Sequence, residues 1–184
     1  MSLPEPASGR RRLHTRRVEM EGFLRDDGLL DLEISLLDVK DVDLKMLAGD
    51  RLAGVPIHKM RIRLTIDMRF NIKAAAAETP GVPYVGHCEA IAPVYEKLVG
   101  LNLFNGFRKA TKDLVGGVHG CTHLTEMLPL FPTLAMQTMT SMISEDSGTH
   151  KPFQLDRCHA LDSSGEVVRR YYPKWFKAHP EENA

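Results

Sequence analysis

Apolar and polar residues alternate one by one along much of the first half of the chain. Val18 and Met20 are flanked by charged residues, and leucine or isoleucine occupies every second position over residues 30–36. A period of two gives a β-strand one buried face. The Arg-Asp-Asp-Gly sequence at 25–28 is a turn signal between the two segments. The pattern therefore predicts a β-hairpin over residues 16–39.

A second pair of strands is expected further along the same alternating region. After a polar connection over residues 40–56, residues 59–66 alternate between charged or polar side chains and large apolar ones. A short turn near residues 67–69 leads to a segment over 70–79 that contains four consecutive alanines. Alanine favours helix, but so short a turn places this segment beside its neighbour, and we predict a strand.

Beyond the fourth predicted strand, the spacing of apolar residues changes to three and four. This spacing is typical of amphipathic helices, and it predicts helices over residues 91–98 and 107–114. A third apolar face extends over residues 122–139, where Pro129 and Pro132 should kink or restart the helix.

Alternation returns near the C-terminus, where residues 153–161 and 167–172 predict another hairpin. The predicted order is thus hairpin, hairpin, helices, hairpin. It indicates an α+β fold in which a mostly antiparallel sheet of hairpins has its helices packed on one face. We expect a single domain over residues 16–176, preceded by a disordered basic arm at 1–15 and followed by a tail at 177–184.

Composition narrows the classes of protein that fit. The 184 residues include 24 Lys and Arg against 24 Asp and Glu, so the formal net charge is zero. Such a chain has no overall attraction for nucleic acid or for an anionic membrane, and no apolar run reaches membrane-spanning length. We expect a cytoplasmic protein that binds neither. A homo-oligomer would use apolar residues that the domain itself does not need, but nothing in the sequence identifies an interface or a partner.

The cysteines have histidines close by. Cys121 lies between His119 and His123, just after three glycines, and Cys88 also follows a histidine. A thiol at a helix start after such a turn loses its proton more readily than a free thiol. The stretch at 116–124 therefore indicates a reactive thiol or a metal ligand. The alternative is a tight turn before a core helix, with Cys121 packed as a small apolar side chain.

Further candidate ligands lie at the boundaries of other predicted elements. His58 precedes the clearest predicted strand, and Cys88 begins a helix. The chain has no Cys-x-x-Cys pair, so any metal site must be assembled by the fold. Cysteine and histidine ligands would suit zinc or an iron–sulfur cluster. The candidate ligands are His58, Cys88, Cys121, His123 and His119.

Three short motifs occur in a recognisable order. They are Gly54-Val55-Pro56-Ile57-His58 before a strand pair, Gly86-His87-Cys88 at a helix start, and His119-Gly120-Cys121 at a later helix start. This order, over residues 54–142, resembles that of the NifU/IscU-type iron–sulfur scaffold proteins, which carry three cysteines at equivalent places. The resemblance implies a NifU/SufE-like fold and a site of His58, Cys88 and Cys121, completed by His119 or His123. His58 stands where that family has its first cysteine.

The whole chain is also similar to an uncharacterised bacterial family described only as a domain of unknown function, which implies no activity. Two other functions fit the same residues. Cys121 is a candidate catalytic nucleophile with His123 or His119 as its base. Because residues two apart in a helix do not face each other, the base would come from elsewhere, such as His87 or His159. The remaining alternative is a non-catalytic binding or assembly module whose cysteines and histidines are structural.

Overall fold

The computed structural model describes residues 3–140, 142 and 151–178. The chain divides into two compact units, residues 1–139 and residues 140–184, and each is described by itself. Residues 1–2 of the expected arm and 179–184 of the expected tail lie outside the described residues, and the expected domain boundaries stay a prediction.

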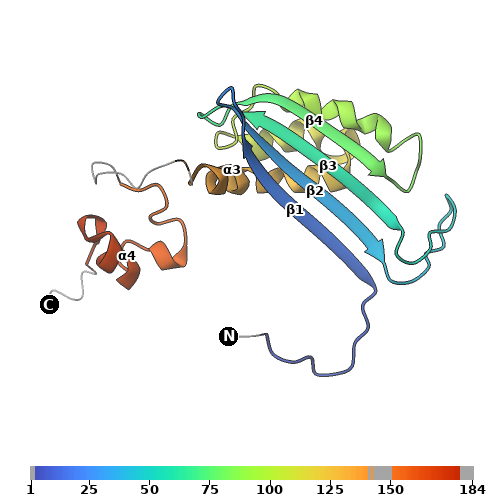
Figure 1. Ribbon diagram of the computed structural model, residues 1–184, viewed down its shortest axis with the longest axis horizontal. Coiled ribbons are helices and arrows are strands. Elements are labelled where there is room, and N and C mark those ends of the chain that lie inside the picture. Colours follow the sequence, from blue (N-terminus) through green and yellow to red (C-terminus); the bar gives the residue numbers. More distant parts are fainter. Residues whose placement is uncertain (1–2, 141, 143–150, 179–184) are drawn as a thin grey trace. The chain divides into compact units, whose positions relative to one another are not determined.

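The first unit begins with a four-stranded antiparallel sheet (Figure 1). Its strands are β1 (His14–Leu24), β2 (Leu30–Lys40), β3 (Pro56–Ile66) and β4 (Ile72–Gly81). Each strand pairs with the next, so the order across the sheet is β1-β2-β3-β4. Both hairpins predicted for this part of the chain are confirmed. The alanine run belongs to β4, because its pairing with β3 prevails over the helix propensity of alanine.

Helical segments follow β4 and cover one face of the sheet, behind the strands in Figure 1. They are the 3-10 helix η1 (Glu89–Leu98), α1 (Phe107–Val115), the 3-10 turn η2 (Gly117–His119), α2 (Thr122–Met127), the 3-10 turn η3 (Leu128–Leu130) and α3 (Phe131–Thr140). The α+β class is therefore confirmed. Pro129 lies in η3, and the helix restarts after it as expected. The segment predicted as an α-helix over 91–98 is a 3-10 helix that contains Pro93, which lacks an N–H donor.

The core of the first unit lies between the sheet and these helices. The even-numbered residues from Leu30 to Asp38 in β2 and from Met60 to Ile66 in β3 are buried, because successive side chains of a strand point to opposite faces. The fully buried side chains include, from the strands, Leu32, Ile34, Ile62 and Leu64 and, from the helical segments, Tyr95, Leu124 and Phe131. The described part of the chain contains no helix with the length and apolarity needed to cross a lipid bilayer.

The second unit contains short helical segments joined by turns, and its described residues contain no strand. It contains the 3-10 turn η4 (His159–Leu161), α4 (Glu166–Tyr171) and the 3-10 turn η5 (Pro173–Trp175). The predicted hairpin over residues 153–161 and 167–172 is therefore wrong. The Asp162 side chain accepts a hydrogen bond from the backbone N–H of Ser164, a turn that precedes the start of α4. Alternation over two such short stretches does not separate a strand from a helix.

Candidate functional site

A buried carboxylate ends the apolar face of β2. The side chains from Leu30 to Leu36 at even positions are buried, and Asp38, next on that face, is only 2% exposed. A buried charge needs compensating partners. They come from the neighbouring strands, because the register places Arg16 of β1 and His58 of β3 directly beside Asp38.

Both oxygens of Asp38 are occupied by these partners. Arg16 donates from Nε to Oδ1 at 2.8 Å and from Nη2 to Oδ2 at 2.7 Å. His58 Nδ1 lies 3.0 Å from Oδ2, and His14 Nε2 lies 3.3 Å from Oδ1. Burial opposes ionisation of Asp38, but the hydrogen bonds from Arg16 and His58 favour it, and the pKa of Asp38 is lowered overall. Asp38 is therefore a carboxylate that accepts the Nδ1–H of His58.

A second imidazole, from the helical segments, lies against His58. His123 of α2 stacks against His58, with ring centroids 3.7 Å apart and planes tilted by 32°. Metal-ligating atoms of Asp38, His58 and His123 all lie within 4.8 Å of one another. Burial and the nearby charge of His123 lower the pKa of His58, and the attraction of Asp38 only partly offsets them. With Nδ1–H held by Asp38, a neutral His58 keeps a free lone pair on Nε2.

Cys121 lies next to this group. Its Sγ is 3.9 Å from Nδ1 of His123 and 4.0 Å from the sulfur of Met60. The hydroxyl of Tyr95, a fully buried residue of η1, lies 3.0 Å from both the backbone N and the backbone O of Cys121. Tyr95 thereby fixes the backbone of Cys121 beside His123.

The glycines before Cys121 allow the chain to turn tightly between α1 and α2. Gly117 has a φ of +57°, in the left-handed region that side chains disfavour. A Cβ on Gly120 would overlap the carbonyl oxygen of Val115, at the end of α1. The expected turn before a helix is present, although α2 has only six residues.

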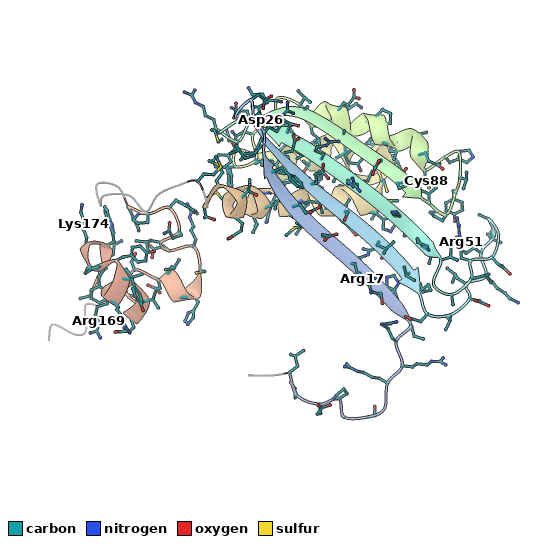
Figure 2. All side chains as sticks on the ribbon, in the orientation of Figure 1. Arg17, Asp26, Arg51, Cys88, Arg169 and Lys174 are labelled. Atoms are coloured by element: carbon teal, nitrogen blue, oxygen red, sulfur yellow. The ribbon has the colours of Figure 1, made fainter. Side chains whose placement is uncertain are left out.

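An open pocket of about 490 Å³ adjoins Cys121. The residues that line it are Tyr84, His87, Cys88, Ile91, Gly120 and Cys121. Figure 2 shows Cys88 beyond the end of β4, close to the start of η1. Two thiols that are 33 positions apart in the sequence thus face the same pocket.

The structure brings most of the predicted ligands together. His58 and His123 converge, Cys121 adjoins His123, and Cys88 shares the pocket with Cys121. His119 is an exposed residue of η2 and belongs to neither the imidazole cluster nor the pocket lining.

Sequence reasoning missed two residues of the site, Asp38 and Arg16. A signal for Asp38 was present, since it continues the even-numbered apolar positions of its strand with a charged side chain. Arg16 also falls at an even position, before Val18 and Met20. Their pairing depends on the register between strands.

A family model described as "Protein of unknown function (DUF2889)" matches residues 14–137, from the start of β1 into α3. The chain belongs to this family. The match covers every residue of the Asp38–His58–His123 cluster as well as Cys88 and Cys121. A search of curated proteins and a search of solved structures each found no match. Membership in a family of unknown function is thus confirmed, whereas the comparisons give no support to the NifU/IscU resemblance or to a bacterial source.

Proposed function

We propose that His58, His123 and Cys121 bind a divalent transition-metal ion, with zinc as the expected ion, and that Asp38 orients His58. The observation that carries the proposal is the convergence of Asp38, His58 and His123 within 4.8 Å from three separate elements. Imidazole nitrogen and thiolate sulfur are ligands that zinc prefers.

One pair of the proposed ligand atoms lies near the spacing expected at a tetrahedral ion. Zinc–sulfur bonds of about 2.3 Å and zinc–nitrogen bonds of about 2.0–2.1 Å place two such ligands roughly 3.5 Å apart. Cys121 Sγ and His123 Nδ1 are 3.9 Å apart, so a small movement of the side chains would bring both to one ion.

Asp38 acts on the ion through His58. Its oxygens already accept hydrogen bonds from Arg16 and His58, which leaves little capacity for direct ligation. A carboxylate that holds Nδ1–H of a histidine directs Nε2 toward a metal, and loss of such a partner typically weakens metal binding by about 10–100-fold. We expect that weakening in Asp38→Asn, with the stoichiometry unchanged.

The test compares histidines inside and outside the cluster. Zinc content by mass spectrometry and binding of Co²⁺ by absorbance are measured for the unmodified protein, His58→Ala, His123→Ala and the control His119→Ala. We expect about one ion per chain in the unmodified protein and in the control, and loss of the ion in the other two variants, each checked for folding by circular dichroism. An unmodified protein that binds neither ion, or equal losses in all three variants, would contradict the proposal.

The fourth coordination position decides the type of site. Structural zinc sites have four protein ligands, whereas catalytic sites keep one position open. Cys88 lines the same pocket as Cys121 and is a candidate for the fourth ligand. Loss of the ion in Cys88→Ala would indicate a closed site, and retention would leave the pocket for water or a substrate.

An iron–sulfur cluster is the alternative occupant, and the shared pocket of Cys88 and Cys121 favours it, because such clusters are held by thiolates. Protein purified without air distinguishes the two. The protein would then contain iron and show charge-transfer absorbance, and both would disappear in the double variant Cys88→Ala/Cys121→Ala. That result would identify the occupant as an iron–sulfur cluster rather than zinc.

Thiol catalysis by Cys121 is a second candidate function, favoured by the position of its Sγ between an imidazole and an open pocket. The Sγ–Nδ1 separation of 3.9 Å exceeds the usual reach of a base, about 2.6–3.2 Å. If His123 is the base, alkylation of Cys121 in metal-free protein should slow at least about tenfold in His123→Ala, with the exposed Cys158 as the internal reference. Equal rates would exclude His123 as the base.

A further inference from the structure

Among the described residues of the first unit, β1 pairs only with β2 and forms an open edge of the sheet. β1 pairs with β2 over all eleven of its residues without a bulge, and it contains no proline. At the other edge, the backbone of β4 is partly covered, because Ile72 exchanges hydrogen bonds with Gly100 and Leu101. Long unbroken edge strands expose backbone groups that can pair with another strand.

The even-numbered residues of β1 direct their backbone groups away from the sheet. Just beyond its two ends, odd-numbered residues face β2: Leu13 accepts from the N–H of Asp41, and Arg25 donates to the carbonyl of Leu29. Because backbone direction alternates along a strand, the N–H and C=O groups of the even-numbered residues, including Val18, point outward.

The side chains of this edge combine apolar and unpaired charged groups. Val18 and Met20, on the helix-covered face of the sheet, are each 42% exposed. Arg17, Glu19 and Glu21 lie on the opposite face, and among the described residues none of them has an ion pair or hydrogen bond from its side chain. Arg17 lies on β1 at the rim of the sheet in Figure 2.

We infer that β1 pairs antiparallel with β1 of a second copy of this chain, with Val18 opposite the partner's Val18. This register places Arg17 opposite the partner's Glu19, and the two-fold symmetry repeats that charge pair. It also places even-numbered residues opposite one another, so the outward backbone groups of both strands can bond. The two four-stranded sheets then continue as one.

The charges select this register over its neighbours. A shift of two residues in the pairing in one direction places Arg17 opposite the partner's Arg17. The same shift in the other direction places Arg17 opposite the partner's Glu21, but it also places Glu19 opposite the partner's Glu19. Like charges directly opposite each other destabilise strand pairing. Of these three registers, only the proposed one pairs Arg17 with an acidic residue and brings no like charges together within β1, which is why a second copy is the occupant.

A charge swap tests the interface in the full-length protein. Sedimentation velocity over a concentration series gives the dissociation constant of the dimer. Arg17→Glu and Glu19→Arg each replace two attractions by two repulsions and should each raise it at least about tenfold. The double variant Arg17→Glu/Glu19→Arg restores opposite charges and should return it to within about threefold of the unmodified protein. Arg108→Glu, an exposed charge reversal on α1, should leave it unchanged.

Three results would overturn the inference. They are an unmodified protein that is monomeric throughout the series, single variants that dimerise as well as the unmodified protein, and a double variant no better than the single ones. Circular dichroism of each variant separates loss of the dimer from loss of the fold. The measurement is also repeated with a chelator. The dissociation constant of the dimer should not change, because the interface does not involve the proposed metal site.

Discussion

At the scale of single residues, Asp38 organises the candidate site. It is buried at the end of the apolar face of β2, and Arg16 and His58 reach it from the strands on either side. The charge of Asp38 is kept because these partners replace the hydration that burial removes. His58 is held in one tautomer and one orientation as a consequence.

Loss of Arg16 should destabilise the fold. Arg16→Ala leaves Asp38 buried with histidine partners alone, and breaking a fully buried pair costs about 3–5 kcal/mol. Arg16 is itself partly exposed, so we expect a decrease of about 2 kcal/mol in the free energy of unfolding, measured by urea denaturation. The control Arg11→Ala, at an exposed position, should change it by less than about 0.5 kcal/mol. Equal effects of the two changes would mean that the histidines alone compensate Asp38.

Asp67 in the turn between β3 and β4 should make stability depend on pH. The hydrogen bond from the Asn71 side chain lowers the pKa of Asp67 most, against a smaller opposing effect of burial, and the backbone N–H of Asn71 and Lys73 add to the lowering. A lowered pKa gives stability that is present above the unfolded-state value of about 3.9 and is lost as pH falls through the folded-state value.

Asp67→Asn should therefore lower the free energy of unfolding by about 1 kcal/mol at pH 7. The difference from the unmodified protein should shrink as pH falls below about 4, because the unfolded chain then binds a proton at Asp67 while the folded protein still favours the carboxylate. Urea denaturation at pH 7, 5 and 3 gives the comparison. Asp26→Asn, at an exposed position of the β1–β2 turn, is the control. A deficit independent of pH would show that the carboxylate charge is not the cause.

At the scale of elements, β1 and α3 approach each other closely at Gly22, where there is no space for a larger side chain. A Cβ on Gly22 would overlap the side chain of Thr138 and would lie 2.8 Å from its Cβ. The contact fixes the distance between strand and helix near the hairpin turn. Farther from the hairpin turn on β1, Val18 and Met20 are half exposed.

Gly22→Ala should consequently lower the free energy of unfolding by about 1–3 kcal/mol, as overpacking does. Truncation of the neighbour in Thr138→Ala should reduce that cost, which a double-mutant cycle measured by thermal denaturation would show. Gly9→Ala is the matched control, since an added Cβ there meets no atom within 4 Å. If the effects of Gly22→Ala and Thr138→Ala on the free energy of unfolding are additive, the side chain of Thr138 is not the cause of the destabilisation by the added Cβ.

At the scale of the whole molecule, the residues assigned to the candidate site all belong to the first unit. Arg16, Asp38, His58, Cys121 and His123 all lie within residues 1–139, and so does the apolar cluster between the sheet and the helices. The family match over residues 14–137 covers nearly the same span. Residues 140–184 form a separate compact unit.

A fragment of residues 1–139 should therefore fold by itself and bind the same amount of metal per chain as the full protein. Circular dichroism, thermal denaturation and metal analysis of the fragment beside the full chain provide the measurement. A fragment that is unfolded would show that the second unit stabilises the first. A folded fragment without metal would place a ligand in residues 140–184.

The sequence by itself determined the strands of the first unit and the location of its helical segments. Alternation with a period of two requires only that a strand has one buried face, and the two hairpins follow from turns of a few residues. The thiols and histidines of the candidate site were also visible, because their residue types and their places at element boundaries are local features. Over the short stretches at 153–161 and 167–172, the same kind of pattern was ambiguous, and the structure has turns and short helical segments there.

Only the tertiary structure decided which of these residues meet. In the sequence, Asp38 is a polar residue that follows an apolar strand pattern. The strand register places Arg16 and His58 beside it. His119 and His123 are equivalent in the sequence, yet η2 exposes the first and α2 turns the second onto His58. Strand register and helix packing join residues far apart in the chain. They depend on the summed burial of whole elements, so the spacing around any one residue does not contain them.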